Sequence, residues 1–113
     1  MGRIEEFNEF RTAINEKVLE RKNRSINRFF NLDAEAYKDG ALDGKTKELM
    51  GLVASMVLRC DDCITYHVLQ CAEHGVTDEE FFEAFNVALI VGGSIVIPHF
   101  RRAVELLEEV RAS

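Results

Sequence analysis

The chain has 113 residues, 47% of them hydrophobic, and a formal net charge of −6. This length is that of one domain, and it allows a modest buried core. The negative charge argues against nucleic acid and anionic membrane surfaces as partners, because both attract proteins with a positive field. We therefore expect a single domain over residues 1–113, without nucleic-acid or membrane partners.

Two helices are predicted in the N-terminal third of the chain. Apolar residues from Ile4 to Val18 recur at helical spacing between charged residues, which predicts an amphipathic helix running to about Arg21. A second apolar set over residues 26–37 predicts a shorter helix, which Asp39-Gly40 ends.

The third and fourth predicted helices contain the residues with reactive chemistry. Asp43 is a suitable N-cap for a helix through Leu58, in which apolar residues follow i, i+3, i+4, i+7 spacing. The next helix is predicted from about Cys60 to Gly75, and a glycine is a common helix stop. Acidic residues at positions 61 and 62 suit the positive end of its dipole.

The fifth predicted helix has the clearest start in the sequence. Residues 77–80 read Thr-Asp-Glu-Glu, which is a capping box. From Ala84 to Ile97 the segment is apolar on every side, a pattern typical of a fully buried helix. A domain this small has few elements to cover it, so we expect a neighbouring subunit to do so, with Gly92-Gly93 allowing close approach. Pro98 either kinks this helix or begins the last one. The last helix has apolar residues at helical spacing from Phe100 to Val110. No strand pattern appears, so we predict an all-α fold of about six helices.

Two cysteines and a histidine share one face of the fourth predicted helix. Cys60 and Cys63 lie one turn apart, near the Cα separation of about 5.5 Å that a disulfide prefers. His67 is four residues after Cys63, so its imidazole is within reach of that sulfur, and Cys–His is a nucleophile–base pairing. A helix N-terminus favours a thiolate, whereas Asp61 and Asp62 oppose it.

Other uses of the CxxC pair are also possible. Zinc would need ligands from elsewhere, such as Glu48, His74 or His99, because Cys60 and Cys71 are about 16 Å apart along a helix axis. Attachment of haem requires a histidine directly after the second cysteine, where this chain has isoleucine. We rank redox use first, zinc second and a purely structural role third.

The remaining candidates are interpreted mainly as structural. Cys71 is expected to be a small core residue and His74 to suit the end of its helix. The role of His99 stays open, with packing favoured, and Tyr66 is expected to pack although it could also face the site. Glu48 is twelve residues before Cys60. If the chain turns back near residue 59, Glu48 comes near His67 and can orient its imidazole.

The cysteine content also indicates a compartment. Three cysteines is an odd number, and no charged-then-apolar segment opens the chain, so we expect neither a secretory signal nor a disulfide framework. We expect a reducing cytoplasm, where a CxxC is more often catalytic or metal-binding.

The pattern Glu48-x11-Cys60-x2-Cys63-x3-His67 resembles the alkylhydroperoxidase D-like members of the carboxymuconolactone decarboxylase family. The flanking segments at residues 40–49 and 72–80 also match these family members. The similarity covers about residues 35–105, with N-terminal helices over 1–34 before it.

The resemblance implies an all-helical protein that assembles as a homotrimer or homohexamer. It implies that Cys63 becomes a sulfenic acid, that Cys60 resolves it to a disulfide, and that Glu48 and His67 form a proton relay. The partners would be a small-molecule hydroperoxide and a dithiol reductant protein, with no metal or cofactor required.

One position departs from the family pattern. Well-studied peroxidase members have a histidine just before the second cysteine, where Asp62 stands here. This difference bears on the strength of the peroxidase activity and on the reductant. The alternatives are a lactone decarboxylase using His67 or His99 as acid–base, and a non-enzymatic helical assembly module with zinc at the CxxC.

Overall fold

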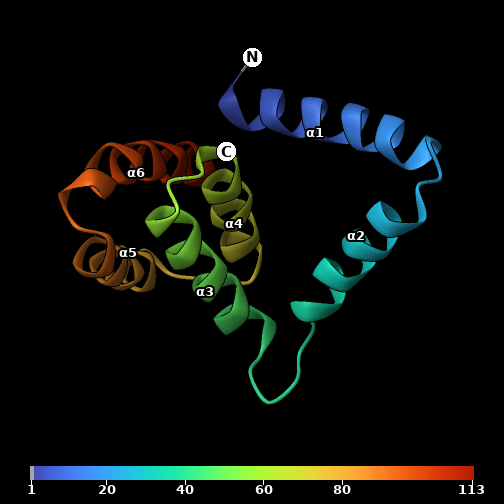
Figure 1. The fold of residues 1–113 in the computed structure, drawn as a ribbon. Helices are drawn as coiled ribbons and strands as arrows, with labels where there is room; N and C mark the ends of the chain where they lie inside the picture. The colour runs from blue at the N-terminus through green and yellow to red at the C-terminus, as the bar shows by residue number, and fades with distance from the viewer. Residues whose placement is uncertain (1) are drawn as a thin grey trace.

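The computed structural model describes residues 2–113, and every regular element in this range is helical, as predicted. Figure 1 shows a body of α3 to α6 and an arm of α1 and α2 that extends away from it. No helix in the described range is long and apolar enough to cross a membrane. The elements are α1 (Arg3–Glu20), α2 (Arg24–Ala36), α3 (Gly44–Val57), α4 (Asp61–Glu73), α5 (Asp78–Gly92), the 3-10 turn η1 (Ser94–Val96) and α6 (Ile97–Ala112).

The predicted caps are present and fix where the helices begin. The Asp43 carboxylate accepts a hydrogen bond of 2.8 Å from the backbone N–H of Thr46 at the start of α3. The Thr77 hydroxyl and the Glu80 carboxylate exchange hydrogen bonds with each other's backbone N–H groups, which completes the predicted capping box of α5. Arg59, with φ of 62°, adopts the left-handed conformation between α3 and α4 and lets the chain reverse.

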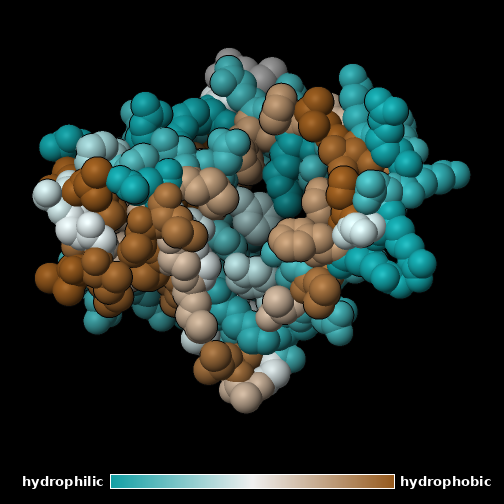
Figure 2. Space-filling model, in the orientation of Figure 1, coloured by the Kyte–Doolittle hydropathy of each residue, from teal (hydrophilic) through white to brown (hydrophobic). Residues whose placement is uncertain are grey.

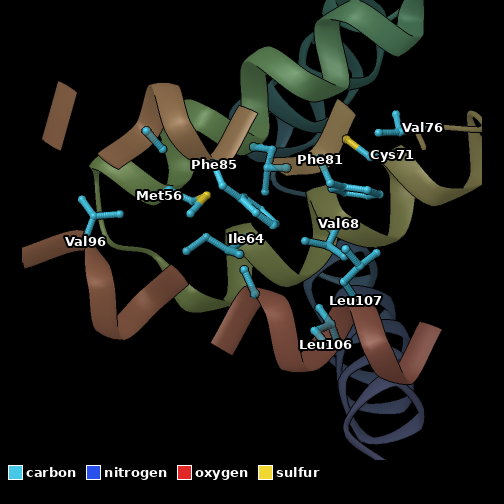
Figure 3. Close-up of a cluster of buried hydrophobic side chains, with 13 residues drawn as sticks. Met56, Ile64, Val68, Cys71, Val76, Phe81, Phe85, Val96, Leu106 and Leu107 are labelled. Carbon is cyan, nitrogen blue, oxygen red and sulfur yellow. The ribbon is translucent and has the colours of Figure 1, made fainter. Parts of the chain in front are cut away.

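The hydrophobic core lies between the four helices of the body. Figure 3 shows Phe81 and Phe85 of α5 packed in a cluster with side chains from α3, α4 and α6. Cys71 is fully buried in this cluster, as predicted. α3 packs closely against both α4 and α5, and α4 packs against α6. The core therefore holds α3 and α4 side by side, which positions the residues discussed below.

The arm contributes no buried residue of its own. Glu109 of α6 holds its beginning, because the carboxylate accepts hydrogen bonds from the backbone N–H groups of Arg3 (3.3 Å) and Ile4 (2.9 Å). Further along, large apolar side chains face outward, and Phe29 is 67% exposed. The amphipathic pattern predicted for this region is thus present, but one chain does not cover its apolar face.

The fifth helix is not fully buried within a single chain, in keeping with the prediction that a neighbouring subunit covers it, although the helix ends earlier than Ile97. α5 ends at Gly92, Gly93 adopts φ of 82°, and Pro98 lies in the first turn of a separate α6. Only one side of α5 is covered, and Ile90 is 86% exposed. Apolar side chains gather over this helix on the left of Figure 2. Exposed residues of this patch and its surroundings are Met50, Leu58, Val87, Ile90, Val91 and Ile95.

Patches of this kind on small domains commonly mark interfaces between proteins. The expected homotrimer or homohexamer stays a prediction, and light scattering at micromolar concentration should give three or six times the chain mass. Ile90→Glu should reduce that mass without unfolding, because Ile90 buries little within its own chain. Ala112→Glu, which adds the same charge at the end of α6, should leave it unchanged. A monomeric wild-type protein would contradict the prediction.

Candidate functional site

The first part of the candidate site is a disulfide at the start of α4. Cys60 is the N-cap and bonds covalently to Cys63, with a Cα–Cα separation of 5.2 Å. The Cys60 sulfur also accepts a hydrogen bond of 3.2 Å from the backbone N–H of Cys63. Cys60 is half-buried and Cys63 exposed, so solvent and small reactants reach the pair. The one-turn spacing that the sequence indicated therefore does form a disulfide.

The second part is a buried carboxylate–imidazole pair. Nδ1 of His67 lies 2.8 Å from Oε1 of Glu48, and the two residues are only 8% and 3% exposed. The pair joins α3 to α4 across the turn at Arg59, as the sequence allowed. A carboxylate only accepts hydrogen bonds, so Nδ1 of His67 carries a hydrogen and donates it to Glu48. In a neutral imidazole, Nε2 is then the basic nitrogen.

A third residue, which the sequence did not single out, faces that basic nitrogen. The Tyr37 hydroxyl at the end of α2 lies 3.5 Å from Nε2 of His67. Burial raises the pKa of Tyr37, and the nearby Glu48 carboxylate raises it further. The phenol therefore stays protonated near neutral pH and donates its hydrogen toward Nε2. Within residues 2–113 no hydrogen bond joins His67 to either cysteine sulfur.

The absence of a side chain at Gly51 makes room for this arrangement. A Cβ atom at Gly51 would lie 2.6 Å from Cε1 of His67 and 2.8 Å from the Tyr37 hydroxyl. Neither separation is possible for real atoms, so any side chain here would push His67 or Tyr37 away. Gly51 lies in the middle of α3, where glycine is otherwise unfavourable by about 1 kcal/mol.

Cys63 and His67 open on one shared cavity of about 330 Å³. The arm forms one wall through Phe7, Phe10 and Arg11, and α4 contributes Asp62 and Tyr66 to the other. The Arg11 guanidinium lies 4.4 Å from the centre of the Tyr66 ring, so it bridges the arm and the body. Tyr66, for which packing was favoured over facing the site, does line the cavity.

The other candidates lie outside the cavity. Burial raises the pKa of Cys71 to about 12, so this residue remains an unreactive thiol. Nδ1 of His74 donates to the carbonyl of Gln70 (2.9 Å) near the end of α4, the structural role expected. His99 does more than pack, because its Nδ1 lies 2.8 Å from the Asp61 carboxylate.

Metal binding has no supporting cluster in the part of the chain that is described. Residues 2–113 contain no group of three or more His, Cys, Asp or Glu side chains placed to hold an ion. Cys60 and Cys63 bond to each other, and the His67 and His99 nitrogens named above face carboxylates on α3 and α4.

The sequence and fold are similar to those of known proteins. The chain is 63% identical in sequence to a Thermotoga maritima protein of known crystal structure. The match covers 95% of this chain and 94% of that one, with a TM-score of 0.92. A Thermotoga maritima structure at 62% identity covers 95% and 91% of the two chains with a TM-score of 0.91; that protein is described as a family member with a suggested part in antioxidative response. A Legionella pneumophila carboxymuconolactone decarboxylase family protein is 29% identical over 94% and 95% of the chains, with a TM-score of 0.86.

A curated relative and a family profile agree with these structures. A Paracoccus denitrificans protein named "Uncharacterized protein 4 in cox locus" is 33% identical over 82 residues, which are 73% of this chain and 74% of that protein. The profile of the carboxymuconolactone decarboxylase family matches residues 23–106, which include all four predicted site residues. The chain belongs to the carboxymuconolactone decarboxylase family.

Proposed function

We propose that the protein is a thiol-dependent hydroperoxide reductase that cycles the Cys60–Cys63 disulfide. The observation that carries this proposal is the disulfide itself, which shares a cavity with an imidazole whose tautomer a buried carboxylate fixes. The antioxidative role suggested for the Thermotoga maritima relative supports the same chemistry.

In the first step the Cys63 thiolate attacks one oxygen of a hydroperoxide. The O–O bond breaks, Cys63 becomes a sulfenic acid, and the alkoxide leaves and takes a proton to give an alcohol. Cys63 is the assigned nucleophile because it is the more exposed of the two residues and lines the cavity together with His67.

The Glu48–His67 pair removes the proton from the Cys63 thiol before this step. A free thiol has a pKa of about 8.5, so near neutral pH most of it is protonated and a poor nucleophile. Nε2 of His67 accepts the thiol proton, directly or through a water in the cavity, and Glu48 stabilises the imidazolium that results. The Tyr37 hydroxyl, 3.5 Å from Nε2, turns its hydrogen away when Nε2 takes the proton, and its oxygen then accepts a hydrogen bond from the imidazolium.

In the second step the Cys60 thiol condenses with the sulfenic acid. The S–S bond forms and water leaves, which gives the disulfide seen in the structure. A dithiol partner then attacks this disulfide, takes over the oxidised state and returns both cysteines to the reduced form. The partner is expected to be a protein with its own reactive cysteine pair.

The walls of the cavity favour an organic hydroperoxide over hydrogen peroxide. Phe7 and Phe10 line it beside Cys63, and an alkyl group packed on these rings would leave water. Arg11 at the same wall can donate to a polar end of such a molecule, whereas the Asp33 and Asp62 carboxylates in the same lining disfavour an anionic one. Cumene or alkyl hydroperoxides are therefore suitable test substrates.

The assignment of the two cysteines predicts different outcomes for their variants. Cys63→Ser should abolish consumption of cumene hydroperoxide, whereas Cys60→Ser should leave a sulfenic acid on Cys63. Dimedone labelling followed by mass spectrometry locates the adduct, and Cys71 should stay unlabelled because it is buried. Cys71→Ser is the matched control and should keep turnover near that of the wild type. An adduct on Cys60 would reverse the assignment.

The contact at Gly51 predicts loss of activity without loss of the fold. Gly51→Ala should lower turnover about 10²-fold or more, within the range of 10²–10⁴ typical for a general base, because the new Cβ displaces His67. Its helical circular dichroism should be retained, since alanine is a better helix former than glycine.

Gly40→Ala is the matched control for this prediction. The Cβ added at Gly40 meets only the Lys47 ammonium, at 3.8 Å, and should leave turnover unchanged. Full activity in Gly51→Ala would show that the position of His67 does not limit the reaction.

A further inference from the structure

Asp61 stands between the two cysteines, and its carboxylate is bound by a residue from another helix. Oδ1 of Asp61 lies 2.8 Å from Nδ1 of His99 in the first turn of α6. The Asp61 side chain is 43% exposed and that of His99 is 22% exposed. The two residues are 38 positions apart in the chain, so the contact depends on the packing of α6 against α4.

The neighbouring carboxylate, Asp62, has no comparable partner. It lines the cavity beside Cys63, and no ion pair within residues 2–113 involves it. The first turn of α4 therefore carries two negative charges next to the cysteines, and His99 donates a hydrogen bond to one of them. Nδ1 can donate this bond in either charge state of the imidazole.

Above a pH of about 8.5, where a free thiol ionises, reduction of the disulfide adds another negative charge beside Asp61 in the chain. Two glutathione molecules supply two electrons and become oxidised glutathione, while the Cys60–Cys63 bond breaks. One sulfur takes up a proton, the other remains a thiolate, and the second proton goes to solvent. Repulsion from a nearby carboxylate disfavours the thiolate, so the charge on Asp61 opposes reduction.

We propose that His99 is a positioning residue for the dithiol, which eases reduction of the Cys60–Cys63 disulfide by holding and partly compensating the Asp61 carboxylate. The inference rests on the redox cycle in the proposed function, but not on the peroxide step. Loss of His99 should leave Asp61 uncompensated and shift the equilibrium toward the disulfide. The expected shift is about two- to fivefold, the size typical of a part-exposed charge pair.

The test is the equilibrium constant of the 113-residue protein with reduced and oxidised glutathione at about pH 9, where a thiolate forms, read by acid quenching and thiol alkylation. His99→Leu removes the donor and keeps an apolar side chain of similar size. His99→Asn retains an N–H donor near the position of Nδ1. Asp61→Asn removes the charge on which His99 acts, and Asp62→Asn is the matched control, because it removes an equal charge that His99 does not contact.

The proposal predicts that the effect of His99→Leu on the equilibrium constant depends on whether Asp61 is present. His99→Leu should shift the constant toward the disulfide in the wild type and in Asp62→Asn, but not in Asp61→Asn, and His99→Asn should restore most of the wild-type value. A merely structural role would move the constant equally in all three backgrounds, which would overturn the proposal, as would an unchanged constant in the wild-type background. Circular dichroism of each variant checks that the helices are retained.

Reduction by dithiothreitol and consumption of hydroperoxide, measured beside the glutathione equilibrium, separate this inference from the proposed function. A folded wild-type protein whose disulfide dithiothreitol cannot reduce would contradict both. A pair that equilibrates with glutathione and shows the predicted dependence on Asp61, in a protein that does not consume hydroperoxide, would support the role of His99 and contradict the peroxidase.

Discussion

The buried hydrogen bond between Glu48 and His67 is the interaction on which the candidate site depends. A carboxylate that is 3% exposed is costly to place in a protein interior unless a donor satisfies it, and His67 supplies that donor at 2.8 Å. The bond links α3 to α4 and fixes which imidazole nitrogen is basic. It therefore serves the packing of the body and the chemistry of the cavity together.

The disulfide stands at the edge of this buried pair, where the environment changes from core to solvent. Ile64 and Val68 on α4 are in the core, while Cys63 in the same helix is exposed. A reactive sulfur must meet a reactant and still lie near a base, and a helix N-terminus at the surface of a packed body satisfies both needs. The arm adds the outer wall of the cavity through Phe7, Phe10 and Arg11. The arm also reaches the buried pair, because the Tyr37 hydroxyl at the end of α2 lies 3.5 Å from Nε2 of His67.

Local sequence patterns predicted the features that depend on local physics. The Asp43 cap and the Thr77 capping box follow from hydrogen bonds between residues three apart, so their spacing alone identifies them. The closeness of Glu48 and His67 required only one reversal of the chain, for which a position near Arg59 was the candidate. The number and order of the helices were predictable because apolar periodicity is also a local pattern.

Features that join distant parts of the chain were not predictable from spacing. Tyr37 has the helical spacing of an ordinary apolar residue, and the approach of its hydroxyl to His67 depends on the path of the loop between α2 and α3. The pairing of His99 with Asp61 spans 38 positions and has no local signal. The all-apolar surface of α5 indicated burial, and the small size of the domain, not the periodicity, favoured a cover from a neighbouring subunit. Within one chain, Ile90 remains exposed.

The most direct test of the proposed relay is a double-mutant cycle on Glu48 and His67. Dithiothreitol-driven turnover of cumene hydroperoxide is measured for Glu48→Gln, His67→Gln and the double variant, with helical content checked in each. If the two residues act as one unit, each single variant loses activity and the double variant is little slower than the slower single one. Losses that multiply, or full activity in Glu48→Gln, would contradict the relay.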